Sequence, residues 1–131
     1  MKGAPDYDAL QTRVLVPAAN VVPLPQRMSF NEAAFLPLAV IPCRAGSYRM
    51  GLPRDTAYTA ADKKGMLVWG GASSFSSAAV QIARTMGFRV YVTASEKHHE
   101  YLKGLGATRA FDCKNENVVG NLVKAAKEDR L

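Results

Sequence analysis

The chain is poor in cysteine, with Cys43 and Cys113 as its two cysteines among 131 residues. Neither lies in a CxxC or Cys/His spacing, which excludes a disulfide framework and a zinc site and favours a reducing, cytoplasmic compartment. No apolar run approaches the roughly 20 residues of a membrane-spanning helix. The start of the chain, Met1 to Asp6, lacks the apolar stretch of a signal peptide. We therefore expect neither membrane insertion nor secretion.

The chain also lacks a concentrated run of charge. Seventeen Lys and Arg against eleven Asp and Glu give a net charge of +6, but the basic residues are scattered. Scattered basic residues are more typical of a solvated face or of binding to phosphorylated ligands than of a nucleic-acid groove. A basic nucleic-acid-binding module stays an alternative, which steep salt-dependent retention on heparin would support. The adjacent His98 and His99 have no third ligand nearby in sequence, so we expect no metal site.

The balance of 48% hydrophobic and 21% charged residues is that of a globular protein. Two regions follow from the change of pattern near Lys63. In the first, residues 12–17 alternate polar and apolar side chains, which predicts a strand. Ser29 to Glu32 form a capping box that predicts the start of a helix. Because proline interrupts helices, we expect this helix to end near Leu36, a second to open at Pro37, and Pro42 to break or kink it.

Residues 48–64 are rich in small, charged and turn-forming side chains, which predicts a surface linker. The second region then alternates apolar strands with amphipathic helices. Strands are predicted over 66–69, 89–93 and 108–112, and helices after each of them, with the second helix over 96–105. Short connections between such elements imply right-handed crossovers and a parallel sheet. The predicted fold class is therefore α/β, the first half of a doubly wound, Rossmann-like sheet.

The turn between the first of these strands and its helix is the candidate phosphate-binding site. In a doubly wound fold this turn carries glycines that let the backbone approach a dinucleotide pyrophosphate at the helix N-terminus. Gly71 fills the first glycine position, whereas Ser73 and Ser76 stand at the second and third. Small residues and hydroxyls here still offer donors to a phosphate, although Gly and Ser also serve as a plain turn and N-cap.

The end of the second strand normally selects between NADH and NADPH. No aspartate ends this strand, and Ser95 and Lys97 are suited to a 2′-phosphate, which favours NADPH. Glu96 is the evidence against this choice, because an inward-facing carboxylate would repel a phosphate. Its alternative role is to stabilise the first turn of the following helix.

Three stretches, residues 14–40, 68–95 and 102–112, together carry a family resemblance. The stretch VWGGASSFSSAAVQIARTMGFRVYVTAS is the central one. The chain resembles the medium-chain dehydrogenase/reductase superfamily, and more narrowly its zinc-independent quinone oxidoreductase and trans-acting enoyl reductase branch of fungal type. The resemblance implies hydride transfer from NADPH to an activated C=C bond or a quinone. It assigns residues 1–64 to the tail of a GroES-like catalytic domain with connecting helices and linker, and 65–131 to a partial cofactor domain of three strand–helix units.

By the same resemblance, the phosphate turn maps to Ser73, Ser74, Phe75 and Ser76, and the 2′-phosphate loop to Ser95, Lys97 and His98. The chain departs from the family pattern at Phe75 and Ser76, where relatives carry valine and glycine. It also departs at Pro42, Arg44 and Cys113, where relatives carry threonine, a small residue and, in some, tyrosine.

The resemblance further implies that much of both domains is missing from this chain, which leaves the first strand as an open apolar edge. We name no catalytic residue. The expected partner is a small-molecule substrate, with no nucleic acid and no membrane. The alternative is a non-catalytic remnant, a homo-oligomer or a half-domain that docks to a larger biosynthetic enzyme.

Overall fold

A computed structural model describes residues 10–131 of the chain, so the prediction for the segment Met1 to Asp6 lies outside the described residues. The chain divides into two compact units, with the boundary along the sequence between Ala33 and Ala34. In the first unit, the predicted strand over 12–17 is wrong, because these residues form a bend followed by irregular backbone. A short 3₁₀ turn, η2, follows at Ala18–Asn20. A strand requires a hydrogen-bonded neighbour, and the sheet of the described residues contains none for 12–17.

Helix α1 spans Phe30–Arg49 without interruption. Its predicted capping box is confirmed: the Glu32 carboxylate accepts from the Ser29 amide at 2.8 Å, and the Ser29 hydroxyl accepts from the Glu32 amide at 3.3 Å. The predicted helix end near Leu36, the new helix at Pro37 and the break at Pro42 are wrong, because both prolines lie inside one helix. A kink at Pro42 stays a prediction. The fixed φ of proline is compatible with a helix. A proline inside a helix therefore removes a hydrogen bond and adds steric strain, but the backbone can still follow the helical path. Both prolines are exposed, where water hydrates the carbonyls they leave unbonded.

Residues 50–64 connect α1 to the sheet, and most of them are exposed, as predicted for a linker, but Tyr48 and Arg49, the first two residues of the predicted linker, lie in α1. The segment contains one 3₁₀ turn, η3, at Ala60–Asp62. It is fixed to the sheet region at Tyr58. The Tyr58 amide donates to the Met86 carbonyl at 2.8 Å, and its ring meets the Phe88 ring edge-on at 4.9 Å.

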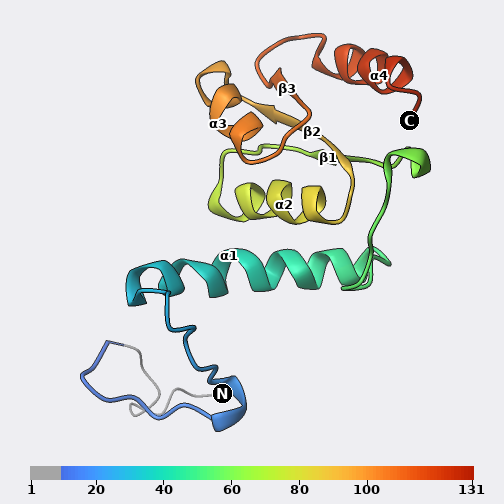
Figure 1. The fold of residues 1–131 in the computed structure, drawn as a ribbon. Helices are drawn as coiled ribbons and strands as arrows, with labels where there is room; N and C mark the ends of the chain where they lie inside the picture. The colour runs from blue at the N-terminus through green and yellow to red at the C-terminus, as the bar shows by residue number, and fades with distance from the viewer. Residues whose placement is uncertain (1–9) are drawn as a thin grey trace. The chain divides into compact units, whose positions relative to one another are not determined.

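The remaining chain alternates strands and helices in the predicted order (Figure 1). The strands are β1 at Gly65–Val68, β2 at Arg89–Ala94 and β3 at Arg109–Asp112, and the helices are α2 at Ser74–Thr85, α3 at His99–Gly104 and α4 at Val118–Glu128. The strands form a parallel sheet in the order β1-β2-β3. The α/β fold with a parallel sheet is thus confirmed. The predicted helix over 96–105 begins later, because Glu96–His98 form a 3₁₀ turn, η4, of the kind common at helix starts.

The core lies on the α2 side of the sheet, around β2. Side chains of a strand alternate between its faces. Val90 and Val92 of β2 accordingly pack with Val80 and Leu102 of α2 and α3, and none of these four side chains is exposed. Helix α4 covers the opposite face (Figure 1). Strand β1 forms one edge of the described sheet, with 51% of Leu67 exposed, which confirms the predicted open apolar edge.

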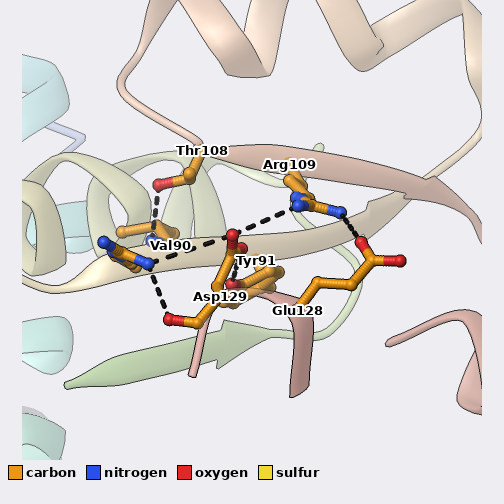
Figure 2. A network of polar contacts seen from close by, with 7 residues as sticks. Val90, Tyr91, Thr108, Arg109, Glu128 and Asp129 are labelled. Carbon is orange, nitrogen blue, oxygen red and sulfur yellow. Dashed lines mark hydrogen bonds and ion pairs between the residues drawn. The ribbon is translucent and has the colours of Figure 1, made fainter. Parts of the chain in front are cut away.

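A polar network holds the end of α4 against the amino-terminal ends of β2 and β3 (Figure 2). The Tyr91 hydroxyl donates to the Asp129 carboxylate, which also accepts from Arg109 at 3.1 Å. Arg109 pairs with Glu128 at 3.0 Å, and Arg89 donates to the Asp129 carbonyl at 2.9 Å. Burial, followed by the Asp129 contact, raises the pKa of Tyr91 to about 12. This network lies at the end of the sheet away from the candidate phosphate turn.

Candidate functional site

The candidate site is at the carboxyl edge of the sheet, where β1 ends in the turn that leads to α2. Gly70 has a φ of +71°, and its amide donates to the Thr93 hydroxyl at 3.0 Å. The Gly71 amide donates to the Thr93 carbonyl at 2.8 Å. A Cβ added to Gly71 would overlap Val92 and would lie 3.3 Å from Leu102. The turn is therefore fastened to the end of β2, and it packs as closely as only glycine allows.

The first turn of α2 is organised by Ser73, its N-cap. The Ser73 hydroxyl accepts from the Ser76 amide at 3.1 Å and lies 3.0 Å from the Ser76 hydroxyl. Ser76 is buried, so its polar groups serve the turn itself. Within residues 10–131, no protein group accepts from the amides of Ser74 and Phe75. Two helix N-terminal donors thus remain for a ligand at the exposed end of α2.

The second group of predicted residues follows β2 at the same edge. Ser95 is the N-cap of η4, and its carbonyl accepts from the His98 amide at 2.9 Å, whereas its hydroxyl makes no capping bond. Lys97 is exposed and forms no ion pair within the described chain. Because carboxyl ends of parallel strands meet at one edge, these side chains follow the same edge as the α2 turn. Glu96 is exposed as well.

The end of β3 completes this edge. The amide of Cys113 donates to the Ala94 carbonyl at 3.1 Å, which places Cys113 directly beside the end of β2. A ring nitrogen of His99 also lies 3.1 Å from that carbonyl. Sequence reasoning considered His99 only as a metal ligand and missed its contact with β2. It also missed Thr93, whose one signal was a hydroxyl inside an otherwise apolar strand.

The family resemblance implies that the segment around Leu38 to Arg44 lies near the nicotinamide and the substrate, and this segment lies in α1. Residues Leu38 and Ala39, together with Ser74 and Ser77 of α2, line a hollow of about 460 Å³. Leu38 itself is 87% exposed. Cys43 is buried, and burial raises the pKa of its thiol. None of these groups has the geometry of a general acid, base or nucleophile.

The donor set at the carboxyl edge fits a phosphorylated ligand. It offers backbone amides at a helix N-terminus, the hydroxyls of Ser74 and Ser95, and the ammonium group of Lys97, which are the groups that bind phosphates in proteins. In the part of the chain that the structure describes, no three His, Cys, Asp or Glu side chains gather as a metal site. No helix of residues 10–131 is long and apolar enough to cross a membrane.

Comparison with known proteins gives a consistent picture, although no protein-family model matches the chain. Over 127 residues, 97% of the chain, it is 49% identical to the trans-enoyl reductase tazE of Aspergillus terreus and 43% identical to the trans-enoyl reductase tndF of Aspergillus flavipes. It covers 42% and 37% of these two proteins, so the chain spans about two fifths of the length of the curated relatives it matches.

Solved structures agree with this picture. The quinone oxidoreductase of Thermus thermophilus, studied alone and in complex with NADPH, is 33% identical with a TM-score of 0.57, and the match covers 72% of this chain and 30% of that one. An NAD-dependent alcohol dehydrogenase is 28% identical with a TM-score of 0.70, and the match covers 84% of this chain and 30% of that one.

Proposed function

We propose that this chain binds NADP(H) at the carboxyl edge of its sheet and takes part in a reductase reaction. It is a relative of the enoyl reductases and quinone oxidoreductases of the medium-chain dehydrogenase/reductase superfamily. Its similarity to enzymes of this kind places it in an oxidoreductase family. When bound, NADP(H) supplies a hydride to an activated C=C bond or a quinone. The substrate itself is a small molecule with such a group.

One observation carries the proposal. The amides of Ser74 and Phe75 are unused at the start of α2, in a turn that Gly71 packs tightly against the end of β2. Helix N-termini of this kind bind pyrophosphate in doubly wound folds. The Ser73–Ser76 hydrogen bonds hold this first turn in shape. We therefore assign Ser73 and Ser76 to positioning the turn, and Ser74 and Phe75 to binding phosphate through their backbone.

The preference for NADPH over NADH rests on the residues after β2. The Ser95 hydroxyl and the Lys97 ammonium are available for a 2′-phosphate, and His98 stands beside them in η4. No acidic residue ends β2, where a carboxylate would bind the 2′-hydroxyl of NADH. Glu96 is the acidic residue in the first turn of η4, and we assign it to stabilising that turn.

The test is a titration of the purified chain with NADPH and NADH, followed by nicotinamide fluorescence. Lys97→Ala is expected to weaken NADPH binding about tenfold and to leave NADH binding within twofold, because the lysine serves the 2′-phosphate alone. Lys124→Ala is the matched control, since Lys124 is equally exposed but lies on α4. Equal affinity of the unmodified chain for both dinucleotides would contradict the assignment of Ser95, Lys97 and His98.

A second substitution tests the turn. Ser76→Gly restores the residue type of the glycine fingerprint, which allows closer approach of a phosphate, and the backbone amide at this position keeps its bond to the Ser73 hydroxyl. If the turn binds pyrophosphate, this variant is expected to bind NADPH more tightly. Unchanged binding in the Ser76→Gly variant would limit the turn to a structural role.

A second candidate function is that of a docking module without its own activity, joined to a larger biosynthetic enzyme or to another copy. The observation in its favour is the open edge of β1, in which Leu67 is 51% exposed, next to Trp69 in the following turn, which is 57% exposed. Unpaired apolar edges favour addition of a further strand. The two candidates predict different results in the same titration. A dinucleotide-binding chain changes the fluorescence of added NADPH, whereas a docking module leaves it unchanged and shows saturable binding only to its partner.

A further inference from the structure

A second cavity lies at the other end of α2 from the phosphate turn. It has a volume of about 440 Å³ and is lined by Val40 and Arg44 of α1, Leu52 and Arg54 of the following segment, and Met86 at the end of α2. Because Met86 is the C-cap of α2 whereas Ser73 is its N-cap, this cavity is separate from the candidate dinucleotide site. Its volume is within the range of small-molecule sites in proteins.

Arg44, one of the residues that line the cavity, has a side-chain nitrogen without a hydrogen-bond partner. Nη1 of Arg44 is buried from solvent, and no group in residues 10–131 accepts a hydrogen bond from it. Among the buried side-chain nitrogens and oxygens of the described residues, it is the one left without a partner. Buried charged groups in proteins are ordinarily paired, since an arginine stays protonated wherever it is placed. An acceptor is therefore missing beside Arg44.

The cavity walls supply a second positive charge and no negative one. Arg54 lines the same cavity, and no Asp or Glu does. Within the described chain, neither Arg44 nor Arg54 forms an ion pair. The hydroxyl of Ser47, which also lines the cavity, donates to the Cys43 carbonyl at 3.0 Å, so its hydrogen is already used. Apart from Ser47 and Tyr48, the polar residues of the lining are therefore two arginines without an ion-pair partner.

The other walls select the kind of anion. Val40, Leu52 and Met86 are apolar and line the same space as the two arginines. Guanidinium groups bind carboxylates through paired hydrogen bonds, and the apolar walls favour a hydrocarbon body next to that carboxylate. An inorganic anion has no hydrocarbon part to pack against these apolar walls.

We propose that the cavity between Arg44 and Arg54 binds a small organic carboxylate, with its carboxylate at the two guanidinium groups and its apolar body against Val40, Leu52 and Met86. The site is independent of the dinucleotide site, so it serves as a separate ligand site of the chain. A ligand there contacts α1, the segment after it and the end of α2, and it stabilises the folded chain by an amount that rises with the logarithm of its concentration above the Kd.

The experiment uses sodium hexanoate as the probe. Binding to the 131-residue chain is measured by calorimetry at constant ionic strength, with chloride in exchange for hexanoate. Hexanamide, which has the same body without the charge, and inorganic phosphate, which has the charge without the body, are the two comparison ligands. We expect saturable binding of hexanoate and at least tenfold weaker binding of hexanamide and of phosphate.

Variants separate the site from general attraction to a basic protein. Arg44→Met and Arg54→Met are each expected to weaken hexanoate binding at least tenfold. Arg49→Met, in the same helix but outside the cavity, is the matched control and is expected to bind within twofold of the unmodified chain. Urea denaturation without ligand checks folding, and Arg44→Met is expected to be no less stable, because it removes the unpaired nitrogen.

Three results would overturn the proposal. If hexanoate binds Arg44→Met as tightly as the unmodified chain, Arg44 does not bind the carboxylate. The acceptor for its buried nitrogen is then bound water. Equal binding of hexanamide would show an apolar cavity without anion recognition. Tighter binding of phosphate than of hexanoate would exclude the organic carboxylate.

Discussion

The substitution Gly71→Ala tests the turn on which the candidate site is built. The added Cβ would overlap Val92 and would lie 3.3 Å from Leu102. Both of these side chains are fully buried, so neither has free space into which to move. The variant therefore carries an overpacking penalty, which in well-packed cores is about 1–3 kcal/mol. Domains of this size have a total stability of roughly 5–15 kcal/mol, so the loss is readily measured.

Urea denaturation followed by far-ultraviolet circular dichroism is the assay. Gly104→Ala is the matched control, because a Cβ there meets nothing within 4 Å and Gly104 is the last residue of α3. Alanine is a better helix former than glycine, so this control is expected to be neutral or more stable by up to about 1 kcal/mol. Gly71→Ala is thus expected to lower the free energy of unfolding, whereas Gly104→Ala is expected to leave it unchanged or raise it.

A double-mutant cycle identifies the cause. Val92→Ala removes the methyl group that the new Cβ would overlap, at its own cost of about 2 kcal/mol for the cavity. In that background, Gly71→Ala is expected to cost at least about 1 kcal/mol less than in the unmodified chain. Equal costs in both backgrounds, or a Gly71→Ala variant as stable as Gly104→Ala, would refute the close packing of the turn against β2.

Three further predictions concern the frame around the site. Tyr91 has a pKa raised to about 12 from an ordinary 10, so its contribution to stability is present below pH 10 and is lost between pH 10 and about 12. Over that interval, the urea midpoint of Tyr91→Phe is expected to fall less steeply than that of the unmodified chain. Pro42→Ala restores a hydrogen bond to the Leu38 carbonyl and is expected to raise stability by about 1–3 kcal/mol, measured by urea denaturation. Ser29→Ala removes the capping hydroxyl of α1 and is expected to lower stability by about 1 kcal/mol, measured in the same way.

The sheet and its order were predictable because local patterns and the global fold agree there. Short, mostly apolar strands alternate with helices from residue 65 onward, and glycines follow the first strand and the first two helices. These local signals all indicate the same alternating fold. Gly71 was predicted on the fingerprint, and the structure gives the reason, since a side chain there would overlap Val92.

The failures come from places where local rules depend on the surroundings. Proline rules predicted breaks in α1, yet the helical φ of Pro37 and Pro42 is compatible with a continuous helix. The alternation in residues 12–17 predicted a strand, but alternation gives no partner strand. The unpaired Arg44 nitrogen depends on burial in the folded chain, and no sequence signal marks it.

The measurement that tests the central claim most directly is a parallel titration of the folded chain with NADPH and NADH, with circular dichroism on the same sample. The account predicts saturable binding that favours NADPH, because the turn before α2 offers free amides and Lys97 stands unpaired after β2. A folded chain that binds neither dinucleotide, or that binds NADH at least as tightly as NADPH, would contradict it.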